Sequence, residues 1–145
     1  LCHRSFPNES ANGVALTANI FDTSGLEPGF YINVQKGGAS VVLPEAGVTT
    51  DQIIYHYFQP GQPAIFLSHS NLVNGSETVL TPTQLYKLGQ ALEHIHMFWM
   101  DTYGPGLGDP MAFYAMDVEF KFDSVAGGSP QLFVKQARPH PGWGL

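Results

Sequence analysis

The strongest constraint on the fold is a single long helix predicted in the second half of the chain. Thr81 is a favourable N-cap, Pro82 suits the first helical position, and Gln84 completes a capping box. Apolar residues then recur at helical spacing and form one stripe: Leu85, Leu88, Leu92, Ile95 and Trp99. Gly104 and the proline after it end the pattern. The sequence therefore predicts a helix from residue 82 to about residue 103, with its stripe facing a core.

Short runs of β-branched and aromatic residues on both sides of this helix predict strands. They cover residues 13–18, 30–34, 40–43, 53–58, 64–68, 111–123 and 131–138. Gly37 and Gly38, between the second and third runs, predict that these two runs form a hairpin. Several strands with one long helix are typical of the α+β class, and we expect a mainly antiparallel sheet on which the helix packs.

Length and charge narrow the class of partner. The chain has 145 residues, which suits one domain, and its formal net charge is −6 with six Lys and Arg. So few basic residues argue against nucleic acid and against an acidic membrane surface as partners. No apolar run approaches the roughly 20 residues of a membrane span. A nucleotide is compatible with this charge, because a few groups and a divalent cation can hold a triphosphate.

The start of the chain and its cysteine content indicate the setting. Cys2 is the single cysteine, so an internal disulfide and a CxxC zinc site are both excluded. The first residues include neither a starting Met nor the apolar stretch of a signal peptide. We therefore expect a segment of a longer protein in a reducing, cytoplasmic compartment.

Two of the predicted strands carry polar residues that can converge. Along residues 116–122 the side chains alternate, so Asp117 and Glu119 point to the same side of their strand. On the next strand Gln136 and Arg138, two residues apart, also share one side, and in a hairpin we expect Glu119 and Gln136 on the same face of the sheet. If the two strands form a hairpin, two carboxylates, an amide oxygen and a guanidinium meet on one patch. Such oxygen ligands suit Mg²⁺, and Arg suits phosphate. The alternative is the solvent side of an amphipathic sheet with routine ion pairs.

The same residues resemble a known family. Met116-Asp-Val-Glu-Phe120, followed by Val134-Lys-Gln-Ala-Arg-Pro139, resembles the closing motif of the ATP-grasp domain of pyruvate,phosphate dikinases and phosphoenolpyruvate synthases. There a D-[IV]-E-[WF] strand precedes a Q-[AST]-R-P strand. Residues 11–19 resemble the G-V-x-F-T-x-[ND]-P segment after the adenine hinge, although Ile20 replaces its proline. Residues 31–42 resemble the G-E-x-V-V hairpin region, but without its acidic residues. The resemblance spans most of the chain and implies the second, C-terminal subdomain of that domain.

The resemblance also implies a function for each site residue. Glu119 and Gln136 would hold Mg²⁺ against the triphosphate of ATP, Arg138 would contact the phosphates and stabilise their charge, and Asp117 would orient its neighbours. In the family, phosphoryl groups pass from ATP to a histidine on another domain and then to pyruvate. The implied partners are the first ATP-grasp subdomain, expected before this chain, and a phosphohistidine domain, expected after it. The isolated chain is expected to be inactive.

Other interpretations stay open. The chain can instead be a divergent ATP-grasp half retained as a non-catalytic structural or interaction module, which Gly38 and Ala39 favour, because acidic residues are usual there. Related phosphotransferases that act on other acceptors share the motif, so pyruvate is the favoured acceptor among several. Three further motifs indicate structure: His69 as a polar strand-end residue, residues 93–96 as an ordinary helical segment, and residues 104–108 as a helix-ending linker.

Overall fold

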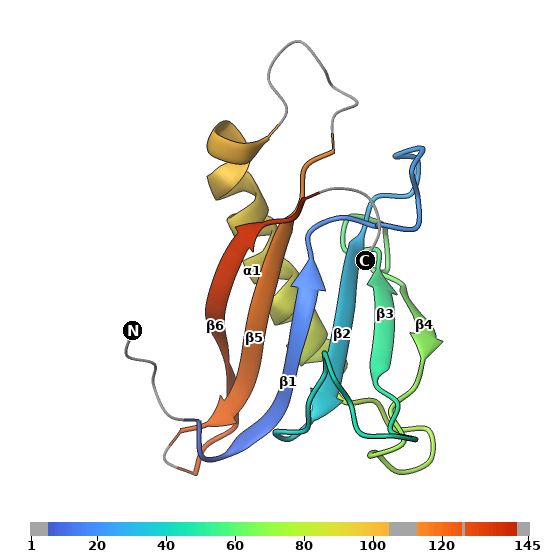
Figure 1. Cartoon of the computed structure of the whole chain (residues 1–145), viewed down its shortest axis with the longest axis vertical. Coiled ribbons are helices and arrows are strands. Elements are labelled where there is room, and N and C mark those ends of the chain that lie inside the picture. The colour runs from blue at the N-terminus through green and yellow to red at the C-terminus, as the bar shows by residue number, and fades with distance from the viewer. Residues whose placement is uncertain (1–5, 105–112, 126, 142–145) are drawn as a thin grey trace.

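One sheet and one helix make up the described part of the chain, residues 6–104, 113–125 and 127–141 of a computed structural model (Figure 1). The elements are β1 (Glu9–Leu16), β2 (Phe30–Lys36), β3 (Asp51–Tyr55), β4 (Ala64–Ser68), α1 (Pro82–Tyr103), β5 (Met116–Ser124) and β6 (Pro130–Pro139). The predicted α+β class, with a mainly antiparallel sheet and one long packed helix, is confirmed. Within these residues no helix has both the length and the apolar character needed to cross a membrane. Cys2 and the linker beyond Gly104 lie outside the described residues.

In the sheet, β1 lies next to β5, so the first strand is close to the β5–β6 hairpin. The sheet runs β4-β3-β2-β1-β5-β6, and every neighbouring pair is antiparallel. β1 lies between β2 and β5, so it connects the hairpins of the first half to the β5–β6 hairpin. In Figure 1 α1 crosses behind the sheet, which leaves the front face of the strands free of helices.

The core lies between α1 and the sheet. Alternate residues of the central strands point toward the helix and are buried there: Phe30, Ile32, Val34, Met116, Val118, Phe120 and Phe122. The predicted helical stripe meets them, with Leu85, Leu88 and Leu92 buried and with Ile95 and Trp99 packed against the cluster. The opposite side of the helix carries exposed polar residues, including Lys87 and Gln90.

The ends of α1 follow the sequence signals. Thr81 Oγ1 accepts a hydrogen bond from the Gln84 amide at 3.1 Å, and Gln84 Oε1 accepts one from the Thr81 amide at 2.9 Å. At the other end the Gly104 amide donates to the Met100 carbonyl at 2.7 Å. The predicted capping box and the predicted stop are therefore both confirmed.

One predicted element is wrong. Residues 40–43 belong to a loop between β2 and β3, and β2 pairs with β3 instead of with these residues. The turn at Gly37 is present, but Asn12 Nδ2 donates to the carbonyls of Gly37 and Ala39 at 2.7 and 2.8 Å and ties the following residues to β1. Since β1 and β3 already occupy both edges of β2, residues 40–43 have no free edge to join.

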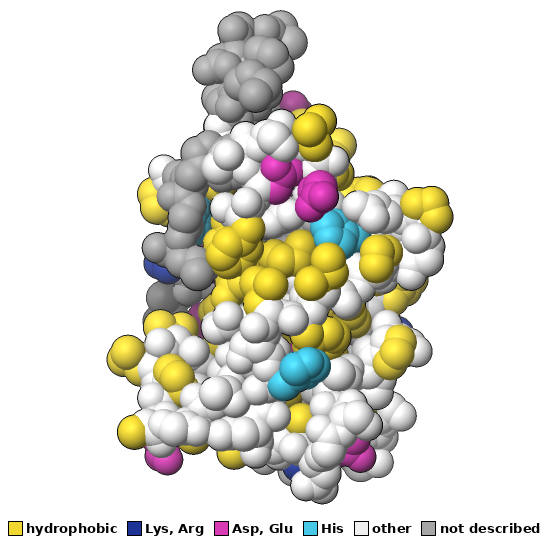
Figure 2. Space-filling view, turned by 90° about the vertical axis from the view of Figure 1, so that its right-hand side faces the viewer, with side chains coloured by type: hydrophobic (Ala, Val, Ile, Leu, Met, Phe, Trp, Pro, Cys, Tyr) yellow, Lys and Arg dark blue, Asp and Glu magenta, His cyan; other side chains and the backbone are white. Residues whose placement is uncertain are grey.

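The two outer edges of the sheet differ in chemistry. Figure 2 looks onto the side formed by β4, where hydrophobic side chains gather in the middle of the face. The exposed large apolar residues on β4 and in its flanking segments are Phe58, Ile65, Leu67 and Leu72. The β6 edge instead carries Lys135 and Arg138 and is bounded by Pro130 and Pro139, features that discourage pairing with another strand.

Candidate functional site

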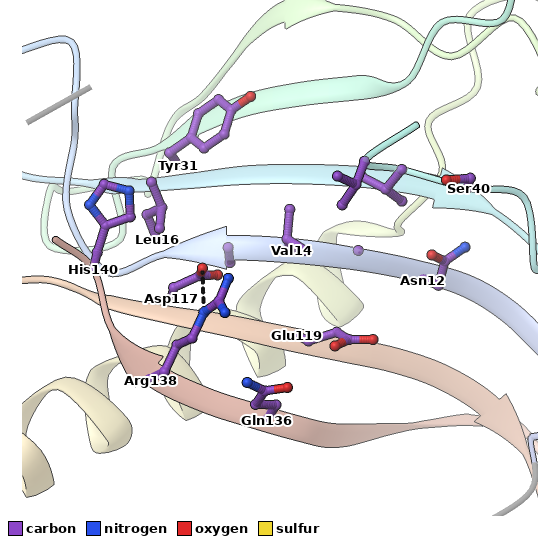
Figure 3. A pocket seen from close by; sticks show the side chains of 14 residues that line it. Asn12, Val14, Leu16, Tyr31, Ser40, Asp117, Glu119, Gln136, Arg138 and His140 are labelled. Carbon is purple, nitrogen blue, oxygen red and sulfur yellow. Dashed lines mark hydrogen bonds and ion pairs between the residues drawn. The ribbon is translucent and has the colours of Figure 1, made fainter. Parts of the chain in front are cut away.

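A pocket of about 610 Å³ lies on the sheet face opposite α1. β1, β2, β5, β6 and the loop at residues 40–42 supply its walls (Figure 3). All four residues that the sequence singled out line it: Asp117, Glu119, Gln136 and Arg138.

The strand register brings these four residues together. In the antiparallel β5–β6 pair, Glu119 is opposite Gln136 and Asp117 is opposite Arg138. Directly opposed residues of an antiparallel pair project from the same face with their Cβ atoms about 5 Å apart. The prediction that Glu119 and Gln136 share a face is therefore confirmed.

Two ion pairs cross from β6 to β5 at the pocket. Arg138 Nε donates to Asp117 Oδ2 at 3.2 Å, and Lys135 Nζ donates to Glu119 Oε1 at 3.2 Å. The Glu119 side chain remains 45% exposed and that of Arg138 67% exposed. Ion pairs with this exposure contribute about 0.2–1 kcal/mol, so both can exchange partners when a ligand of higher charge arrives.

Lys135 does not line the pocket itself, but it pairs with Glu119, which does, and sequence reasoning missed this contact. The register shifts between Glu119, opposite Gln136, and Phe120, opposite Val134, so Lys135 is the extra residue of a β-bulge. Strict alternation along β6 puts Lys135 on the face opposite Gln136. The bulge instead allows its ammonium to reach Glu119.

Apolar side chains also line part of the pocket. Figure 3 shows Asn12 and Ser40 toward one end and Leu16, Tyr31 and His140 toward the other. Leu16 and Tyr31 also belong to a small apolar cluster on this side of the sheet, and burial raises the pKa of the Tyr31 hydroxyl. The pocket therefore offers apolar contact from Leu16 and Tyr31 next to the charged side chains of Asp117 and Arg138.

The donors at Glu119 and Gln136 fit a hard cation. A carboxylate and an amide oxygen on opposed positions suit Mg²⁺, which usually takes one or two protein groups and completes its shell with phosphate and water. Across the described residues, no three His, Cys, Asp or Glu side chains converge as a metal site. These residues thus suit a cation that arrives with an anionic ligand better than one held by protein groups alone.

An acidic residue also lies beside the glycine turn. Gly38 and Ala39 are not acidic themselves, but a Cβ added to Gly38 would overlap Glu9 Oε1. Glu9 pairs with Lys121 of β5 and does not line the pocket. The sequence did not point to Glu9, because its approach to Gly38 depends on the pairing of β1 with β2.

His69 takes no part in the pocket. Its ring stacks on Phe66 at 4.8 Å between centroids, and its Nδ1 lies 4.0 Å from Asp51 Oδ1. These contacts are consistent with its interpretation as a polar residue just after a strand.

Comparison with family models, with curated proteins and with solved structures finds no match to this chain. The case for a function therefore rests on the residues of the pocket.

Proposed function

We propose that this chain is the C-terminal part of an ATP-grasp nucleotide-binding domain of the pyruvate,phosphate dikinase and phosphoenolpyruvate synthase type, and that its pocket binds Mg·ATP. The observation that carries the proposal is the register of β5 and β6, which sets Glu119 against Gln136 and Asp117 against Arg138. These four residues stand at the polar positions of the D-[IV]-E-[WF] and Q-[AST]-R-P patterns of that family.

Each of the four residues has a task in this proposal. Glu119 and Gln136 hold the cation, and Arg138 offers a planar guanidinium to phosphate oxygens. Asp117, 3.2 Å from Arg138 Nε, keeps the guanidinium directed into the pocket. Bound Mg²⁺ supplies neutralisation of phosphate charge. Phosphoryl transfer depends mainly on positioning and charge stabilisation, so no nucleophile is needed from this chain.

The reaction needs partners beyond these residues. The proposed parent is a cytoplasmic phosphotransferase, in which a first ATP-grasp subdomain completes the nucleotide site and a histidine on another domain accepts the phosphoryl group before pyruvate does. The alternative is a non-catalytic module derived from the same fold. Its support is that both carboxylates of the pocket are already paired with cations of β6.

The first test is binding to the 145-residue chain. We expect Mg·ATP to shift the amide NMR signals of residues 117–119 and 136–138 with a Kd near or above 1 mM, about −4 kcal/mol, because half of the nucleotide contacts are missing. The double variant Glu119→Gln/Arg138→Met should lose these shifts. The matched control, Glu45→Gln/Lys36→Met, changes two exposed charges outside the pocket and should retain them.

The second test distinguishes the phosphotransferase proposal from the non-catalytic module. In the parent protein, Glu119→Ala or Arg138→Ala should abolish conversion of ATP to AMP in the presence of pyruvate and leave the melting temperature nearly unchanged. Normal conversion with both residues replaced would refute the site assignment and favour the non-catalytic module.

A further inference from the structure

We propose that Lys135 and Glu119 form a partner-exchange pair. When a polyphosphate enters the pocket with a divalent cation, Lys135 leaves Glu119 and donates to a phosphate oxygen, and the freed carboxylate binds the cation. This inference rests on the proposed function for its ligand, and it adds Lys135 as a phosphate-binding residue.

The bulge in β6 provides the geometry. Because Lys135 is the extra residue between the pairs Glu119–Gln136 and Phe120–Val134, its side chain reaches the face that carries the pocket. Its Nζ atom lies 3.2 Å from Glu119 Oε1. A long, flexible lysine stem can move its ammonium by several ångströms without a change in the strand.

The charges explain why the exchange needs both parts of the ligand. A divalent cation alone must compete with the Lys135 ammonium for the Glu119 carboxylate. A polyphosphate alone is repelled by the Glu119 carboxylate, which lies beside the cations of β6. When both arrive together, the cation takes the carboxylate, the phosphate takes the ammonium, and no charge in the pocket is left without a partner.

The neighbouring ion pairs do not share this arrangement. Arg138 pairs with Asp117, its direct partner in the register, without a bulge. Lys121 projects from the same sheet face as Glu119 but pairs with Glu9, which does not line the pocket, whereas Lys135, also outside the lining, pairs with Glu119, which does. Lys121 therefore provides a matched control: a partly buried lysine in an ion pair on the same face, away from the ligand.

The test is a pair of NMR titrations of the 145-residue chain, one with MgCl₂ alone and one with Mg·ATP. Lys135→Met should bind Mg²⁺ about two- to fivefold more tightly, because the carboxylate loses its competitor. The same variant should bind Mg·ATP about tenfold more weakly, because a charge-assisted hydrogen bond to phosphate is lost. A lysine with a purely structural role would not move the two affinities in opposite directions by these amounts.

Removing any nearby positive charge acts weakly in the same two directions, and Lys121→Met measures that background. At about 0.15 M salt we expect it to change each affinity by less than about twofold. Lys135→Arg retains the charge and should keep both affinities near those of the wild type, so the proposal stays testable if the Met variant folds poorly.

The outcomes distinguish this inference from the proposed function. If the wild type binds Mg·ATP at residues 117–119 and 136–138 but Lys135→Met behaves like Lys121→Met, the exchange is refuted and the nucleotide site stands. If Mg·ATP shifts no signals of the wild type, the proposed function fails and the exchange fails with it.

Discussion

At the scale of single residues, His96 is a partly buried histidine of α1 that does not line the pocket described above. Its Nδ1 lies 2.7 Å from Thr17 Oγ1, which also accepts a hydrogen bond from the Met116 amide at 2.8 Å. The Thr17 proton is thus available to Nδ1, an arrangement that suits a neutral imidazole. Tyr114 donates its hydroxyl to the His96 carbonyl at 2.6 Å, and burial lowers the pKa of His96 below its ordinary value.

This lowered pKa predicts a dependence of stability on pH. Between the folded pKa and the unfolded value of about 6.5, the unfolded chain binds more protons than the folded chain. The free energy of unfolding should therefore fall as the pH drops through about 6.5, and this contribution should level off below the folded pKa. Melting curves between about pH 7.5 and about pH 5.5 should show a smaller decrease for His96→Gln than for the wild type.

The control for this prediction is on the same helix. His94 is exposed, so His94→Gln should keep the pH dependence of the wild type. Equal slopes for His96→Gln and the wild type would show that His96 is not the titrating group.

The face on which a side chain lies could be predicted from the sequence only where the strand alternates regularly. Asp117 and Glu119 lie on a regular strand, so a period of two was enough to place them on one face. Lys135 reaches the pocket through a bulge, and Glu9 approaches Gly38 across a strand pair. Neither arrangement leaves a local pattern in the sequence.

At the scale of elements, α1 makes a tight contact at Gly89 with aromatic residues of β3 and of the segment after it. A Cβ at this position would lie 2.6 Å from Tyr57 Cδ2 and 2.8 Å from Tyr55 Cε2. Tyr55 is buried in the core, so it has little room to move. The missing side chain of Gly89 lets α1 lie directly on the aromatic residues of β3 and of the segment after it.

Gly89→Ala therefore sets two effects against each other. Alanine is favoured over glycine in a helix by about 1 kcal/mol, whereas overpacking a core typically costs about 1–3 kcal/mol. We expect the second effect to prevail and the free energy of unfolding in urea to decrease. Gln90→Ala, at the exposed neighbour, should stay within about 0.5 kcal/mol of the wild type. A Gly89→Ala variant more stable than the wild type would show that the helix stands further from the sheet.

Elements were predictable where their signals are local. The capping box, the apolar stripe and Gly104 all lie within or beside α1, and they defined both of its ends. The segment 40–43 has the composition of a strand, but whether it forms one depends on which strands pair with the two edges of β2. That competition involves β1 and β3 and cannot be read from the segment itself.

At the scale of the whole molecule, the sheet depends on pairing between distant parts of the chain. β5 fills the edge of β1 that β2 leaves open, and its residues Met116, Val118, Phe120 and Phe122 complete the core against α1. Without the β5–β6 hairpin, α1 would lose much of the apolar surface on which it packs.

A chain of residues 6–104 should therefore fail to fold cooperatively. We expect poorly dispersed NMR signals and a thermal transition that is broad or absent. Addition of a peptide of residues 113–141 should restore dispersion, since it supplies the missing hairpin. A cooperative transition in residues 6–104 alone would show that this part folds without the β5–β6 hairpin.

The strand order also has a consequence for biosynthesis. The walls of the pocket come from β1 and from β5 and β6, which are synthesised about 100 residues after it. A growing chain on the ribosome cannot form the pocket until the β5–β6 hairpin has emerged, however long β1 has been outside. A product shortened by premature termination would lose the sheet and the pocket together. Ligand binding could then begin only once β6 is available, and quality control would meet products that end before it as unfolded chains.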